Sequence, residues 1–189
     1  IELSNALPIN GAAFDASGST AVVTALVQAV ASTGSTKTSV LDQALGQPVT
    51  VPRAATARVQ PKGDFALIAD PGIFDVSVRP LAASGFSWLV VPGVAVGIPG
   101  ASSAGANLMS RALPLPVVYR GTVTLPAADG KSKAPVPGAL IRAFVYTALG
   151  QYTSDDTKAD SVVQIAETRA TSEGEFKLLI PATLNGAVR

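Results

Sequence analysis

The sequence predicts an all-β protein made of two tandem β-sandwich domains, and three observations support this. Residues 24–30 recur as residues 138–144 at an offset of 114 positions, and residues 63–68 recur as residues 174–179 at an offset of 111. Two earlier glycines repeat as well, pairing Gly11 with Gly121 and Gly18 with Gly130. The apolar residues, 48% of the chain, are mainly Ala and Val among Gly, Pro, Ser and Thr, which is typical of short strands and many turns.

The duplication divides the chain into three parts. We predict a first domain over residues 1–98, a linker rich in Gly, Pro, Ser and Ala over residues 99–116, and a second domain over residues 117–189. The linker shows no strand-like alternation, but it carries three apolar residues able to pack against a domain: Leu108, Met109 and Leu113.

The first domain reads as short strands between Asp, Gly and Pro turns. The segment 22–31 could be a buried helix, but its valines favour a strand. The segment 73–78 alternates apolar with polar residues, as a half-buried strand does. A polar insertion fills residues 32–47, with one helical turn expected at 39–45. The expected strands are 8–14, 22–31, 48–51, 55–59, 64–69, 73–78, and 89–91 with a possible extension to 96.

The second domain is shorter than the first. Its polar insertion is residues 151–160, and its expected strands are 117–125, 139–147, 162–169 and 175–180. The counterpart of the strand 73–78 would fall on residues 186–189, which are too few. Either the second domain is truncated, or its last strand comes from elsewhere.

The order of these motifs resembles the carboxypeptidase regulatory-like domain family. The runs that carry the resemblance are Gly121-Thr122-Val123, residues 137–141 and residues 168–178, and the first half shows the same order at Gly11, residues 25–29 and residues 56–73. The resemblance implies a seven-stranded, transthyretin-like or Ig-like β-sandwich for each half. It also implies an accessory module of secreted and envelope-associated bacterial proteins.

Composition excludes several classes of function. The net charge is +1 and no basic run is present, so the chain lacks the electrostatic footprint of a nucleic-acid-binding protein. Without His or Cys it cannot form a Ser-His-Asp triad, a Cys nucleophile with its His base or a typical zinc site. The most apolar run, residues 89–98, is too short to span a bilayer. The start of the chain lacks the features of a signal peptide, which predicts that such a peptide is absent or already removed.

A few side chains remain as candidates for binding. Phe86 and Trp88 form the densest aromatic group, and an exposed Trp on a sandwich stacks on sugars or anchors a partner, although a buried Trp that closes the core is the simpler interpretation. Tyr146 and Tyr152 flank the second insertion. Three acids, Asp155, Asp156 and Asp160, could gather around calcium, but their spacing does not match an EF-hand and a solvated loop is favoured. We assign no catalytic residue, because the acids Glu167, Glu173 and Glu175 are expected to face solvent beside Lys177 and Arg169.

These observations predict a non-catalytic structural or adhesion module of a bacterial cell-envelope or secreted protein, with other protein chains as partners. No cofactor, nucleic-acid partner or transmembrane segment is expected. One alternative is a subunit of an oligomer or filament completed by strand exchange. Another is a carbohydrate-binding module that uses Trp88 and the loops at one end of a sandwich.

Overall fold

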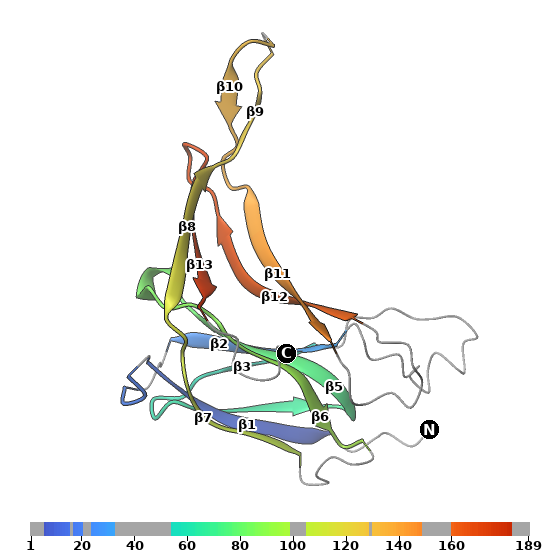
Figure 1. Ribbon diagram of the computed structural model, residues 1–189. Coiled ribbons are helices and arrows are strands. Elements are labelled where there is room, and N and C mark those ends of the chain that lie inside the picture. Colours follow the sequence, from blue (N-terminus) through green and yellow to red (C-terminus); the bar gives the residue numbers. More distant parts are fainter. Residues whose placement is uncertain are drawn as a thin grey trace, which may run out of the picture.

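The computed structural model describes residues 6–15, 17–20, 24–32, 54–98, 105–128, 130–148 and 160–182, and their regular structure is almost entirely β. Figure 1 shows the first half of the chain as a layered body and the second half as an elongated arm above it. The expected strand at 48–51, the helical turn at 39–45 and residues 186–189 lie outside these ranges. Within them, no helix has the length and apolar character needed to cross a membrane.

In the first half, two sheets face each other across one core. The first sheet has the order β4-β1-β7, with β1 (Leu7–Phe14), β4 (Asp64–Ala69) and β7 (Ala106–Ala112). The second has the order β3-β2-β5-β6, with β2 (Ala25–Ala31), β3 (Ala54–Arg58), β5 (Gly72–Pro80) and β6 (Leu89–Val96). Alternate residues of both sheets point into the same cluster, including Ile9, Phe65 and Leu67 from one sheet and Val27, Phe74, Val76 and Val96 from the other. This packing is consistent with a β-sandwich.

We predicted a linker without strands over residues 99–116, and this prediction is wrong because β7 lies within that range. This strand pairs parallel with β1, and Leu108 and Leu113 are buried in the core of the first half. Met109 does not pack as expected: it is 72% exposed and has a φ of 57°. The register shifts here, with two residues of β7 opposite Gly11, so the strand bulges and Met109 points outward.

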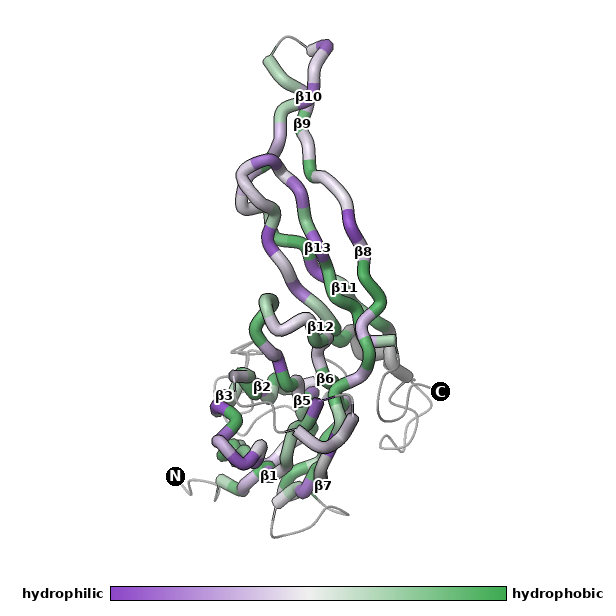
Figure 2. Tube along the Cα trace, turned by 90° about the vertical axis from the view of Figure 1, so that its left-hand side faces the viewer, coloured by the Kyte–Doolittle hydropathy of each residue, from purple (hydrophilic) through white to green (hydrophobic). Residues whose placement is uncertain are grey.

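In the described residues of the second half, the strands form three two-stranded pairs. β8 (Pro116–Thr122) pairs with β13 (Glu175–Pro181), and β11 (Leu140–Ala148) pairs with β12 (Asp160–Arg169). The short strands β9 (Thr124–Pro126) and β10 (Lys133–Pro135) form a hairpin that projects from the far end of the arm (Figure 1). A small buried cluster here consists of Val163 and Ile165 together with Val90 of β6. Figure 2 shows hydrophobic stretches along β8 and β11 in this open arm.

The repeated sequences adopt the same local structure in both halves. Gly11 of β1 lies opposite Phe65 of β4, and Gly121 of β8 lies opposite Phe176 of β13. β2 pairs with β3 so that Leu26 lies opposite Arg58. β11 pairs with β12 in the same register, with Leu140 opposite Arg169. The glycine turns also correspond: the Gly63 amide donates to the Gln60 carbonyl at 2.8 Å, and the Gly174 amide donates to the Thr171 carbonyl at 3.1 Å.

Candidate functional site at the junction of the two halves

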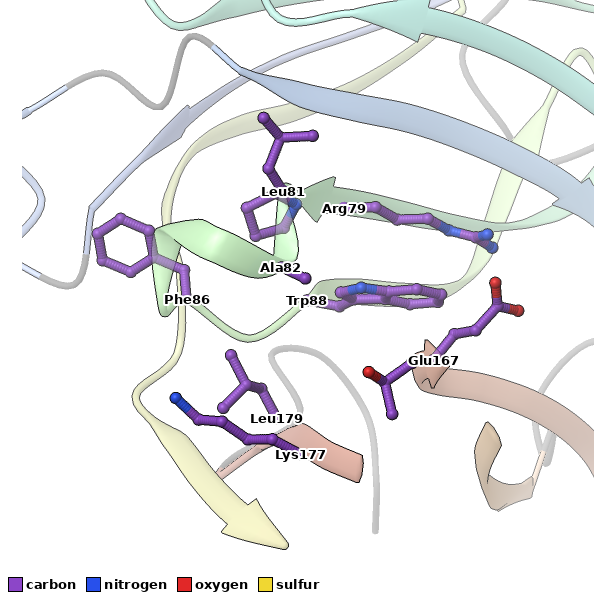
Figure 3. Close-up of a pocket in the computed structure, with 10 residues that line it drawn as sticks. Arg79, Leu81, Ala82, Phe86, Trp88, Glu167, Lys177 and Leu179 are labelled. Atoms are coloured by element: carbon purple, nitrogen blue, oxygen red, sulfur yellow. The ribbon is translucent and has the colours of Figure 1, made fainter. Parts of the chain in front are cut away.

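A cavity of about 230 Å³ lies where the first half meets the arm (Figure 3). The end of β5 and the segment that follows it form one wall, and β12 and β13 form the other. The residues of the first wall are Arg79, Pro80, Leu81, Ala82, Phe86 and Trp88; those of the second are Glu167, Thr168, Lys177 and Leu179. The site therefore exists only when both halves are in place.

Trp88 is positioned by the connection between β5 and β6. A 3-10 turn, η1 (Ala82–Ser84), ends at Gly85, whose φ of 77° lets the chain reverse without steric cost. Ser87 is fully buried, and its hydroxyl donates to the Pro114 carbonyl at 2.6 Å. These constraints hold the partly buried Trp88 against the cluster of Val90, Val163 and Ile165.

Arg79 covers one face of the Trp88 indole. Its guanidinium carbon lies 4.1 Å from the ring centroid, within cation–π range, and its Nε donates to the Ser77 hydroxyl at 2.9 Å. Burial lowers the pKa of Arg79 and Glu167 opposes this shift, but a guanidinium stays charged. Figure 3 shows Leu179 and Lys177 on the side of Trp88 away from Arg79. One face of the indole is therefore occupied within the chain itself.

Glu167 is held as a carboxylate at the edge of the cavity. The Arg142 Nε donates to its Oε2 at 2.8 Å, and the Gln164 side-chain amide donates to the same oxygen at 3.1 Å. The hydrogen bond from Arg142 is the main cause of a lowered pKa for Glu167. An acid kept ionised in this way cannot supply a proton near neutral pH. The site therefore offers recognition by charge and aromatic surface, with Arg79 and Lys177 as the cations.

The structure brings some of the sequence-predicted residues together. Phe86 and Trp88 line the same cavity, and so do Glu167 and Lys177. The ion-pair partner of Glu167 is Arg142, which the sequence did not indicate. Tyr146 belongs to β11 and Asp160 begins β12, whereas Tyr152, Asp155 and Asp156 lie outside the described residues. In the part of the chain that the structure describes, no cluster of His, Cys, Asp and Glu could hold a metal ion.

Sequence reasoning missed the partners of Trp88. Nothing in the sequence marks Leu179 as its neighbour, because β13 is distant along the chain. Arg79 comes from β5, the strand that precedes β6, and the pairing of Val78 with Leu89 brings Arg79 beside Trp88. The Arg142–Glu167 pair occupies the position of the Gln28–Thr56 pair of the first half, so the repeat offsets predict it once the register of β2 with β3 is known.

The arm carries a second notable feature, an exposed apolar surface. On β8, three consecutive residues, Val117, Val118 and Tyr119, are 46%, 45% and 57% exposed; we call them the β8 surface. Successive residues of a strand point to opposite faces, so both faces of β8 are accessible. Leu125 of β9 and Phe144 of β11 are also exposed.

No protein-family model, curated protein or solved structure matches the chain. Function must therefore be inferred from the chain's own geometry.

Proposed function

We propose that this chain is a non-catalytic structural module whose arm makes contact with another protein. In this proposal the two halves are tandem, transthyretin-like β-sandwich domains of a secreted or bacterial cell-envelope protein. The observation that carries it is the contrast between the halves: the first buries most of its apolar residues between two sheets and exposes large ones only at scattered positions, while the second exposes the three consecutive residues of the β8 surface and Phe144. Exposed apolar patches of this kind mark interaction sites.

The junction supports a structural role. Trp88 packs against residues of the arm, and Arg79 stacks on the indole while lying in the field of Glu167. These contacts fix the arm to the body, as a module that presents a binding surface requires. The resemblance to accessory domains of bacterial surface proteins agrees with this role and suggests the extracellular or envelope location.

The test measures whether the β8 surface is open in solution. We expect a dye that fluoresces on apolar surfaces to bind the native chain, and a Val117→Ser/Tyr119→Ser double variant to lose most of that signal. Met109→Ser is the matched control, because Met109 is an even more exposed but isolated apolar residue of the first half. Hydrogen exchange should show rapid exchange in β8 and slow exchange in β1.

A chain with a covered β8 surface would contradict the proposal. In that case the dye would not bind and β8 would be as protected as β1. Light scattering over a wide concentration range then separates the routes to contact: a growing mass identifies self-assembly, and a constant mass with an open β8 surface identifies a different partner protein.

Carbohydrate binding at the junction cavity is a second candidate. The cavity places an indole and a phenyl ring beside charged groups that hydrogen-bond to hydroxyls, although Arg79 leaves one indole face at most for a sugar. Trp88 is the sole tryptophan, so its fluorescence reports directly on this site. A saturable change in emission with a monosaccharide, lost in Lys177→Ala, would support this candidate, and unchanged emission across a sugar panel would remove it.

A further inference from the structure

The repeat shows that one edge of the arm lacks a neighbour that its equivalent in the first half possesses. β2 lies between β3 and β5, pairing antiparallel with both. β11 is the repeat of β2, and β12 stands where β3 stands. Among the described residues, no strand pairs with the other edge of β11, where β5 would lie.

The backbone groups of β11 point toward this edge at alternate residues. The Val59 amide donates to the Ala25 carbonyl, so the groups of Ala25 face β3; the Ser32 amide donates to the Ile73 carbonyl, so the groups of Ser32 face β5. The alternation of an antiparallel ladder then directs the Leu26 and Gln28 groups to β5.

The arm repeats this pattern. The Ala170 amide donates to the Ala139 carbonyl, so this carbonyl faces β12. By the same alternation, the amides and carbonyls of Leu140 and Arg142 point to the open edge. An edge with aligned, unpaired backbone groups is a template for strand addition.

The first half also shows what kind of strand fits there. Opposite Val27, Ala29 and Ala31, β5 places Val78, Val76 and Phe74. The residues between them are Ser77 and Asp75, and Arg79 follows Val78. On β11 the equivalent positions hold Ile141, Ala143 and Val145, which are all partly buried. A strand that continues this apolar face needs apolar residues at three alternate positions and polar residues between them.

We propose that the open edge of β11 binds an extended segment of another polypeptide, antiparallel, with apolar residues opposite Ile141, Ala143 and Val145. This proposal rests on the proposed function and names the chemistry of the partner: a strand patterned like β5. Backbone hydrogen bonds supply the affinity, and the apolar alternation sets register and specificity. β8 also has an open edge, but its equivalent in β1 takes a parallel, bulged strand, which is a weaker pairing.

The experiment uses the full chain and a labelled synthetic peptide with the sequence of β5, residues 72–80. We expect saturable binding, followed by fluorescence anisotropy. A peptide with Phe74→Ser, Val76→Thr and Val78→Thr should bind about tenfold more weakly or worse. Two further peptides test the backbone geometry: N-methylation at Ser77 removes an amide that faces β11 and should abolish binding, whereas N-methylation at Val78 removes an amide that faces away and should not.

A variant of the chain locates the bound peptide. Proline is tolerated in a strand where its missing amide faces an open edge, so Leu140→Pro should fold with an unchanged melting temperature but not bind the peptide. Leu26→Pro is the matched control, because the equivalent amide in the first half is paired with β5, and its melting temperature should fall clearly.

The outcomes separate this inference from the proposed function. Absence of binding, equal binding of the two N-methyl peptides, or binding that survives Leu140→Pro would overturn strand addition at β11. Each of these results is compatible with an open, dye-binding β8 surface, in which case the interaction module stands and contact occurs elsewhere. Growth in mass of the chain alone that competes with the peptide would identify a second copy as the strand donor.

Discussion

Gly11 and Gly121 occupy equivalent positions under phenylalanine rings, and the two halves should respond differently when either gains a methyl group. A Cβ at Gly11 would lie 2.6 Å from the Phe65 ring, and a Cβ at Gly121 would lie 2.8 Å from the Phe176 ring. Phe65 is 5% exposed within the closed core, whereas Phe176 is half-buried in the open arm and has room to move.

We therefore expect Gly11→Ala to destabilise the chain by about 1–3 kcal/mol, the usual cost of overpacking. Gly121→Ala should cost less, because the Phe176 ring can tilt away. The reduced flexibility of the unfolded chain contributes about 0.4–1 kcal/mol of stability in both variants and so does not affect the comparison. Urea unfolding of both variants measures the difference. Equal losses would show that the Phe176 ring is as confined as that of Phe65.

Two aspartates should give pH dependences of opposite sign. Burial raises the pKa of Asp75 above 3.8, although the Gly93 amide donates to it at 3.0 Å. Ionised Asp75 thus costs stability, a cost that appears as pH rises through its folded pKa. The hydroxyl of Ser17 and the Thr20 and Ser19 amides lower the pKa of the exposed Asp15 to about 2, so its stabilisation is present above pH 3.8 and is lost as pH falls toward about 2.

Asp75→Asn should therefore raise the melting temperature at neutral pH relative to wild type, and this gain should vanish at pH values below 3.8. Asp15→Asn should lower the melting temperature at neutral pH and converge with wild type as the pH approaches 2. Thermal unfolding of the three proteins over this pH range checks both signs. A gain for Asp75→Asn that persists at low pH would mean that the Asp75 charge is not its source.

At the scale of elements, strands with a local signal could be predicted from sequence. The segment 64–69 alternates in burial and matches β4, and the predicted strands at 73–78 and 175–180 lie within β5 and β13. The repeat also places Gly121 opposite Phe176 once Gly11 is known to face Phe65. β7 could not be predicted, because its Asn, Ser and Arg residues and its bulge at Met109 break alternation, and its stability comes from β1, distant in sequence.

The candidate site likewise contains residues that could be predicted from the sequence and residues that could not. Trp88 and Phe86 could be singled out as the dense aromatic pair, since residue type and spacing suffice for that. Arg79 reaches Trp88 through the pairing of β5 with the next strand, β6. Leu179 reaches the same cavity only when β13 docks against the first half, which is a tertiary property. The buried serine that holds the loop, Ser87, likewise acts through Pro114, whose position depends on the path of β7.

At the scale of the whole molecule, the two halves differ in their ability to fold alone. The first half has a core formed by both of its sheets, including Leu113 at its end. The arm's buried cluster is small and includes Val90 of β6, with Trp88 packed against it, so removal of the first half would expose part of the arm's own core. A two-stranded pair is marginal in water without such packing.

A cut between residues 114 and 115 tests this dependence. We expect the fragment 1–114 to show dispersed NMR signals and cooperative unfolding, because it keeps Leu113 and the bond from Ser87 to the Pro114 carbonyl. The fragment 115–189 should lack cooperative unfolding, since it loses Val90 and Trp88. A second-half fragment that unfolds cooperatively would show that the arm is an independent domain, and the junction would then be a docking contact between two finished bodies. If the arm instead folds only in contact with the first half, the first half holds the open edge of β11 in place. The geometry available to a strand that binds there then depends on the packing of Trp88 and Val90.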